Sequence, residues 1–120
     1  MKLGLGLRLG FDIRMAGGTL SAPTLTSLSI AGGSASLNWT SATADSFEIY
    51  RGTSTGVYTL LDTVLGSETS YNDATVVDGT TYYYAIKQVY GVLTSGYSNE
   101  MSAYALYAAA FIANTGNDLT

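Results

Sequence analysis

The amino-acid sequence predicts an all-β fold, a sandwich of seven strands. Between residues 24 and 104, segments that alternate apolar and polar side chains recur about every 8–12 residues, separated by clusters of Gly, Ser, Asn and Asp. Hydrophobic residues make up 47% of the 120 residues, which is enough apolar surface for the core of one domain. The single proline, Pro23, precedes the first segment, where its missing N–H disturbs no central strand.

Turn residues bound the expected strands, whose number is that of a small Greek-key sandwich. Because side chains alternate between the two faces of a strand, every second residue of each segment is expected in one shared core. The aromatic residues of that core are expected to pack against each other rather than to stack on a ligand. The expected strands cover residues 24–30, 34–40, 46–51, 57–64, 70–73, 80–90 and 97–104, and the structural core is expected to contain Trp39, Ile49, Tyr82, Tyr84 and Ile86.

The composition argues against several classes of function. With five Lys and Arg against nine Asp and Glu, the net charge is −4, whereas nucleic-acid binders gain most of their affinity from cations on phosphates. The sequence contains no cysteine and no histidine, so it lacks thiolate ligands as well as the commonest general base and metal ligand. We therefore expect a protein that is not an enzyme, with no cofactor, no metal site and no nucleic-acid partner.

Three acidic residues near an expected turn are candidates for a calcium site. Asp73 and Asp78 flank residues 74–77 and Glu68 precedes them, but calcium requires about six converging oxygen ligands. Aspartates that cap local backbone groups explain the same positions with fewer requirements. The turn interpretation is therefore preferred.

Residues 77–86, which contain the run Gly-Thr-Thr-Tyr, resemble the corner and the following strand of fibronectin type III domains. This resemblance implies that the hydroxyl of Tyr82 forms a hydrogen bond back to the backbone of the corner. Trp39 matches the tryptophan of the family's second strand, and either Tyr50 or Phe47 matches the aromatic residue of the third.

Two further segments, residues 49–58 and 97–103, are similar to a hairpin and to the last strand of bacterial members of this family. The four motifs occur in the family's order, which implies a fibronectin type III-like (Ig-like) sandwich over residues 21–105. The resemblance alone says little about function, because this sandwich hosts many unrelated roles.

Residues 1–20 are expected to form an extended N-terminal β-arm and a linker. In residues 3–13, apolar side chains alternate strictly with residues that are mostly glycine, which permits close approach of another backbone. A cleaved signal peptide is the rival interpretation, but Arg8 interrupts the apolar run. Because an isolated strand is not stable in water, we expect the arm to add to a β-sheet of another subunit. The expected assembly residues are Leu3, Leu5, Leu7, Leu9, Phe11 and Ile13.

Residues 106–120 are expected to form a C-terminal apolar segment. The alanine-rich stretch of residues 104–113 favours a helix with Tyr107 and Phe111 on one face, and a continuation of the last strand is the alternative. In either case Tyr107 and Phe111 are the expected contact residues. The polar end of the sequence could begin another helix, so we expect the natural chain to continue beyond Thr120.

The glycine–leucine opening and the apolar end are similar to structural proteins of phages that infect Bacteroidota. This resemblance implies a non-catalytic structural protein of an ordered assembly, such as a virion decoration, fibre or tail component, located in the virion or outside the cell. Its partners would be protein subunits of the same or a neighbouring kind, in an oligomer. No stretch approaches the ~20 apolar residues of a transmembrane helix, so no membrane span is expected.

The alternative function is an adhesion or carbohydrate-binding accessory module of a secreted bacterial protein. Tyr90 and Tyr97 flank the loop of residues 91–96 and are the candidate contacts for a surface glycan, since tyrosine rings stack on sugars. Tyr50 and Tyr83 are also expected to face outward. Cross-strand packing explains such tyrosines equally well and is the interpretation that we favour.

Overall fold

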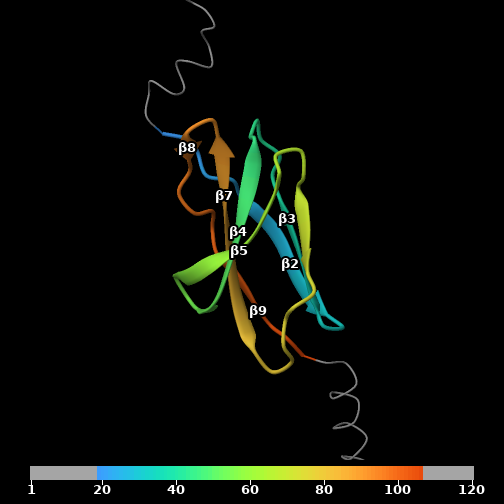
Figure 1. Ribbon diagram of the computed structural model, residues 1–120. Coiled ribbons are helices and arrows are strands. Elements are labelled where there is room, and N and C mark those ends of the chain that lie inside the picture. The colour runs from blue at the N-terminus through green and yellow to red at the C-terminus, as the bar shows by residue number, and fades with distance from the viewer. Residues whose placement is uncertain (1–18, 107–120) are drawn as a thin grey trace, which may run out of the picture.

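The computed structural model describes residues 19–106, in which two antiparallel β-sheets pack face to face (Figure 1). The smaller sheet has three strands in the order β2-β3-β6; in the five-stranded sheet β5, β4 and β7 lie side by side, and β8 and β9 both pair with β7. The described residues contain no helix, so the predicted all-β sandwich is confirmed. The strands are β2 (Leu25–Ala31), β3 (Ser34–Trp39), β4 (Ser46–Ser54), β5 (Val57–Leu65), β6 (Ser70–Asp73), β7 (Thr81–Tyr90), β8 (Leu93–Thr94) and β9 (Met101–Tyr104).

The first six expected strands are present, and their bounds differ by a few residues at most. The largest difference is in β4, which was expected to end at Arg51 and continues to Ser54. It continues because the hairpin that joins β4 to β5 contains register shifts, between Ile49 and Tyr50 and again between Arg51 and Ser54, that keep the strands paired.

The expected last strand, residues 97–104, is wrong in its first half. β8 was not predicted, and the edge next to β7 consists of two short strands separated by residues 95–100. In this gap the hydroxyls of Ser95 and Ser98 accept hydrogen bonds from two amides of β7, those of Gln88 and Ile86, each at 2.9 Å. Serine side chains thus replace main-chain carbonyls of a regular strand, as short hydroxyl side chains often do.

Several predictions for the chain ends fall on residues that the structure does not describe. The arm residues Leu3 to Ile13, together with Tyr107 and Phe111, lie outside residues 19–106. Within the described part, Tyr104 ends β9, and the two residues after it are not helical. In residues 19–106 we also find no helix of the length and apolarity needed to cross a membrane.

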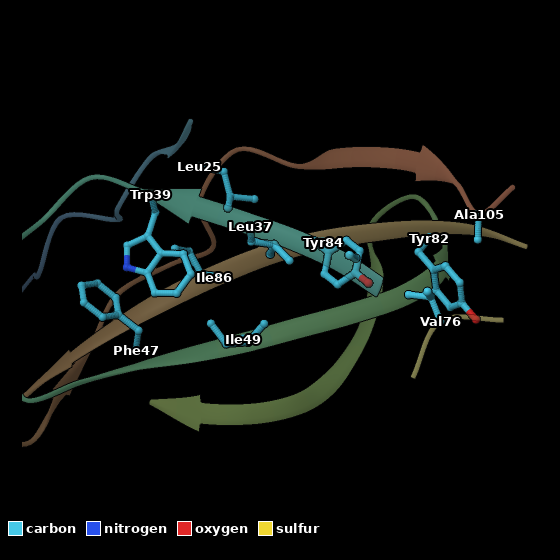
Figure 2. Packing of buried hydrophobic residues seen from close by; sticks show 11 residues of the cluster. Leu25, Leu37, Trp39, Phe47, Ile49, Val76, Tyr82, Tyr84, Ile86 and Ala105 are labelled. Atoms are coloured by element: carbon cyan, nitrogen blue, oxygen red, sulfur yellow. The ribbon is translucent and has the colours of Figure 1, made fainter. Parts of the chain in front are cut away.

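The core lies between the sheets and takes alternate side chains from both (Figure 2). Trp39 of the smaller sheet packs against Phe47 of the larger one, with ring centroids 5.4 Å apart and tilted planes. Burying an aromatic ring of this size stabilises the fold by about 1.5–3 kcal/mol. The residues expected in the core, Trp39, Ile49, Tyr82, Tyr84 and Ile86, are all at most 5% exposed.

A tyrosine closes the turn between β6 and β7. The hydroxyl of Tyr82 accepts a hydrogen bond of 2.8 Å from the amide of Val77, which is the contact that the family resemblance implied. The amide of Gly79, whose φ of 88° is strained for other residues, donates to the carbonyl of Ala105 at 2.7 Å. The turn therefore also holds the end of the described chain.

Close approach of two strands explains why glycine is needed at a second position, residue 52. A Cβ added to Gly52 of β4 would overlap the main-chain carbonyl of Val57 on β5. Because the obstructing atom belongs to the backbone, relief would require the hairpin to shift. Gly96 offers a contrast, since a Cβ there would meet nothing within 4 Å.

We expect Gly52→Ala to lower the free energy of unfolding by about 2 kcal/mol, the usual cost of forcing extra volume into a packed site. Urea unfolding followed by tryptophan fluorescence would measure the change. Gly96→Ala is the matched control and should stay within about 0.5 kcal/mol of the wild type. An equal effect of both substitutions would contradict the overlap at Gly52.

Candidate functional site

The outer face of the larger sheet, which points away from the core, carries an aromatic cluster. Tyr50 of β4 is paired with Leu60 of β5 on one side and with Ala85 of β7 on the other, so all three residues share this face. Two residues earlier in β4, and therefore on the same face, Glu48 is paired with Lys87. The result is a surface of mixed character, with an apolar row beside a charged row.

Two tyrosines of the hairpin between β4 and β5 meet a third from the segment after β8 on this face, and we call them the tyrosine cluster (Tyr50, Tyr58 and Tyr97). The ring of Tyr97 contacts Tyr50 edge-on at 5.0 Å between centroids and contacts Tyr58 in a similar way at 4.9 Å. The ammonium of Lys87 lies 4.3 Å from the centre of the Tyr97 ring and 5.3 Å from that of Tyr50. Such cation–π contacts contribute about 0.5–1 kcal/mol each at exposed sites.

Two carboxylates accept hydrogen bonds from the hydroxyls of the cluster. Tyr50 donates to Glu48 at 2.9 Å, and Tyr58 donates to Glu100 at 2.6 Å. Desolvation, followed by the hydrogen bond to the neighbouring carboxylate, raises the pKa of Tyr50 and that of Tyr58 to about 12. Both hydroxyls therefore stay protonated, and remain hydrogen-bond donors, at any physiological pH.

Glu100 also holds the hairpin between β4 and β5. Besides the bond from Tyr58, it accepts hydrogen bonds from the hydroxyl of Thr55 at 2.8 Å and from the amide of Gly56 at 2.9 Å. These hydrogen bonds, that of Tyr58 first, lower the pKa of Glu100. Glu100 was not predicted as part of the site, because its partners lie more than forty positions earlier in the chain and form no local pattern.

The predicted ligand contacts do not form one surface. Tyr97 is 43% exposed and belongs to the tyrosine cluster on the outer face. Tyr90 is half-buried at the end of β7, where alternation puts it on the same side as Ile86 and Gln88, toward the core. Tyr83 alternates toward the outer face as expected and is half-buried as well. Tyr97 is thus the tyrosine of the predicted pair that a ligand on the outer face could reach.

A buried carboxylate joins the two sheets on the opposite side of the larger sheet. Asp73 of β6 is 1% exposed and pairs with the guanidinium of Arg51 at 2.8 Å. It also accepts hydrogen bonds from the hydroxyl of Tyr84 at 2.7 Å and from the amide and hydroxyl of Thr75 at 3.0 and 2.6 Å. The hydrogen bond from the Thr75 amide is the capping of a local backbone group that was predicted for this aspartate. The bonds from Arg51 and Tyr84 of the other sheet were not predicted.

The charge of Asp73 is stabilised by these partners. Burial alone would raise the pKa of this carboxyl, but the hydrogen bonds from Thr75, Tyr84 and Arg51 outweigh burial and lower it. Burial, together with the bond to Asp73, raises the pKa of Tyr84 far above its usual range. Among residues 19–106, no group of three or more acidic, His or Cys side chains is arranged to hold a metal ion.

An apolar patch surrounds the end of the described chain. A pocket there is lined by the apolar residues Ile30, Val76, Ala105 and Leu106 together with Gly33 and Asp78. Beside it, Val77, Tyr104 and Leu106 are 61%, 55% and 47% exposed. We call the exposed residues Val77, Tyr104 and Leu106 the C-terminal patch.

Solved structures with this fold identify the family. A Fn3-like protein from Clostridium thermocellum is 34% identical, and the alignment covers 72% of this chain and 95% of that protein, with a TM-score of 0.59. The chain belongs to the fibronectin type III family. No family model and no curated protein matches the sequence.

Other structures share the fibronectin type III fold at lower identity. A two-domain segment of chicken tenascin is 25% identical over 72% of this chain and 51% of its own, with a TM-score of 0.62. A β-1,2-glucanase from Parabacteroides distasonis reaches a TM-score of 0.68 at 22% identity, but the fibronectin type III chain spans only 13% of it. The chain spans 28% of pectate lyase PelI from Erwinia chrysanthemi, again at 22% identity. The likeness to these two enzymes shows the fold alone.

We expect Asp73→Asn to lower the free energy of unfolding of the fibronectin type III domain by about 2–4 kcal/mol at pH 7, because Arg51 and Tyr84 lose a charged acceptor. The folded-state pKa of Asp73 is lowered, so its contribution is present above the unfolded value of about 4 and is lost as the pH falls further. Urea unfolding between about pH 6 and pH 2 should therefore show a shallower acid dependence in the variant than in the wild type. The exposed Asp78→Asn is the control, and parallel pH curves for wild type and Asp73→Asn would contradict the prediction.

Proposed function

We propose that this fibronectin type III domain is a non-catalytic structural module of an ordered assembly, in which the sandwich is displayed and the two terminal segments make the contacts. The observation that carries the proposal is the position of the chain ends. The described chain enters beside β8 at one end of the sandwich and leaves beyond β9 at the opposite end (Figure 1). Segments attached at these points are available to different neighbours.

Exposed apolar residues at both ends support this proposal. At the end where the chain leaves, the C-terminal patch adjoins an apolar pocket. At the other end, Leu65 and Val92 are 69% and 86% exposed. Side chains of this kind are common singly on surfaces, but grouped next to an apolar chain terminus they favour a contact with protein.

The chemistry of the side chains supports a non-catalytic role. The sequence has no histidine and no cysteine to act as base or nucleophile. Among the described carboxylates, Asp73 is neutralised by Arg51, and Glu100 is occupied by the hairpin. The resemblance of the chain ends to phage structural proteins would place the assembly in a virion, as a decoration, fibre or tail component, or elsewhere outside the cell.

A second candidate function is glycan binding by the tyrosine cluster, favoured by the 43% exposure of Tyr97. Exposed tyrosine rings offer apolar faces to sugars. However, Tyr97 already contacts two other tyrosine rings and the ammonium of Lys87, so a sugar would have to displace Lys87 from one face. Assembly remains the preferred function for this reason.

Light scattering of the purified chain tests the proposal. We expect the full-length chain to have a mass several times that of one subunit, rising with concentration, because its apolar ends need partners. A chain that begins at Gly17 should have the mass of a single subunit and the same unfolding midpoint, since the sandwich does not depend on the arm. A full-length chain that stays monomeric at all concentrations would contradict self-assembly.

If the full-length chain stays monomeric, a glycan array would test the second candidate function, sugar binding. Specific retention of the wild-type domain, lost in Tyr97→Ala and kept in Val92→Ala, is the outcome expected of a sugar-binding tyrosine cluster. Val92 is a suitable control, because it is more exposed than Tyr97 and lies in the turn between β7 and β8.

A further inference from the structure

The open edge of β5 is the longest strand edge that the described chain leaves unpaired. The nine residues of β5 pair with β4 on one side only. The other outer strands offer less, because β6 and β9 have four residues each and β8 has two. The start of β2 is covered by Asn99, whose side chain bonds both the amide and the carbonyl of Leu25, at 2.8 and 3.1 Å.

The β5 edge lacks two of the devices that protect natural edges. Proteins blunt such edges with lysine, proline or bulges. β5 contains neither lysine nor proline, and its one charged residue is Asp62. Its pairing with β4 has two register shifts, but Asp62 to Leu65 pair regularly with Ser46 to Ile49. Within this regular stretch the amide of Thr63 donates to the carboxylate of Asp62 at 2.7 Å, so a further strand would have to use the other main-chain groups of the edge or displace that carboxylate.

A groove lies next to this edge, between the two sheets. It is lined by residues of β5 and β6, among them Val64, Leu65 and Tyr71, with Glu68 between the two strands. Val64, Tyr71 and the neighbouring Leu61 are only partly buried, although they pack against the core. A strand added to β5 would place every second side chain over this groove, and apolar side chains there would complete the burial of these residues.

We propose that the occupant of the β5 edge is the N-terminal arm, residues 3–13, of a second copy of this chain. The proposal rests on the proposed assembly function and identifies its acceptor. The arm has the required period of two, with apolar residues for the groove and mostly glycine for the solvent side. Its eleven residues are enough to follow the nine of β5.

Charge favours the same pairing. The first fourteen residues contain Lys2, Arg8 and Arg14 against the single acid Asp12. The acceptor edge and groove contain Asp62 on β5 and Glu68, with no lysine or arginine among their residues, whereas Glu48 on the neighbouring strand is paired with Lys87. A basic arm on an acidic edge gains from electrostatic complementarity, which also fixes the register.

The proposed assembly function, rather than the length of the link, favours a second copy over the arm's own domain. Leu20 is buried, and the carbonyl of Ser21 accepts a hydrogen bond of 2.7 Å from Gln88 of β7, so the described chain begins beside β7 and β8 (Figure 1). From β7 to β5 is two interstrand spacings, about 10 Å. The six residues 14–19 that join the arm to Leu20 span at most about 21 Å. Chain length thus permits the arm of either copy to reach β5, and the disulfide experiment below distinguishes the two arrangements.

Disulfide trapping in the full-length chain tests this proposal cleanly, because the sequence has no cysteine. The arm variants are Gly4→Cys, Gly6→Cys and Gly10→Cys, which leave the leucines intact and sample the unknown register. The acceptor variant is Thr63→Cys, which is exposed on β5 and lies on the outer face, opposite Glu48. One arm variant and the acceptor variant are mixed in urea, refolded together and oxidised. Val92→Cys replaces Thr63→Cys in the control.

We expect at least one arm variant to form a mixed disulfide with Thr63→Cys and none to do so with Val92→Cys. We also expect the double variant Thr63→Lys/Leu65→Lys, which adds charge to the edge, to reduce the mass in light scattering to that of one subunit. Val92→Lys should keep the wild-type mass. Unfolding midpoints within a few degrees of the wild type would show that the Lys variants remain folded.

Other outcomes would overturn the proposal. A wild-type oligomer that survives Thr63→Lys/Leu65→Lys would reject the β5 edge but leave the assembly function intact. A disulfide that closes within one chain of Gly6→Cys/Thr63→Cys, without mixed disulfides between chains, would show that the arm covers its own domain. A wild-type chain that is monomeric throughout would reject both the assembly function and this acceptor.

Discussion

The carboxylate of Asp73 links the two sheets through side-chain hydrogen bonds. The chain contains no cysteine, so no disulfide links them. Asp73 lies on β6 of the smaller sheet and takes hydrogen bonds from Arg51 and Tyr84, which belong to two strands of the larger sheet. Removing one member of such a buried pair costs far more than the pair contributes relative to apolar residues. The main effect of Asp73 is therefore to position the backbone, since its hydrogen bonds fix where β6 ends and where the turn that leads into β7 begins.

The turn between β6 and β7 also positions the end of the described chain. Tyr82 binds the amide of Val77, and Gly79 binds the carbonyl of Ala105, so the corner and the chain exit form one hydrogen-bonded unit. On the outer face the tyrosine cluster is likewise satisfied internally, by Lys87 and two glutamates. The edge of β5 differs from both regions, because among the described residues no strand other than β4 pairs with it, although the amide of Thr63 donates to the carboxylate of Asp62.

Local patterns were sufficient to predict the sandwich but not the contacts between its distant parts. Alternation around Trp39 and Tyr84 identified the inner faces, because each strand buries one side. It could not reveal that Arg51 reaches Asp73, since both residues also suit an exposed turn or strand. Glu100 and Tyr58 are forty-two residues apart in the sequence and meet only in the folded sandwich. Ser95 and Ser98 interrupt the last strand through side-chain hydrogen bonds that a period of two does not encode.

The placement of the chain ends has a mechanical consequence. A force applied between two neighbours bound at the opposite ends would act along the strands rather than across them (Figure 1). β2 is held by β3 in one sheet, and β9 by β7 in the other. Their ladder hydrogen bonds run perpendicular to the strands, so such a force would shear all the bonds of a ladder at once instead of opening them one by one. This placement of the two ends would therefore make the domain a stiff link under tension if neighbours bind at both.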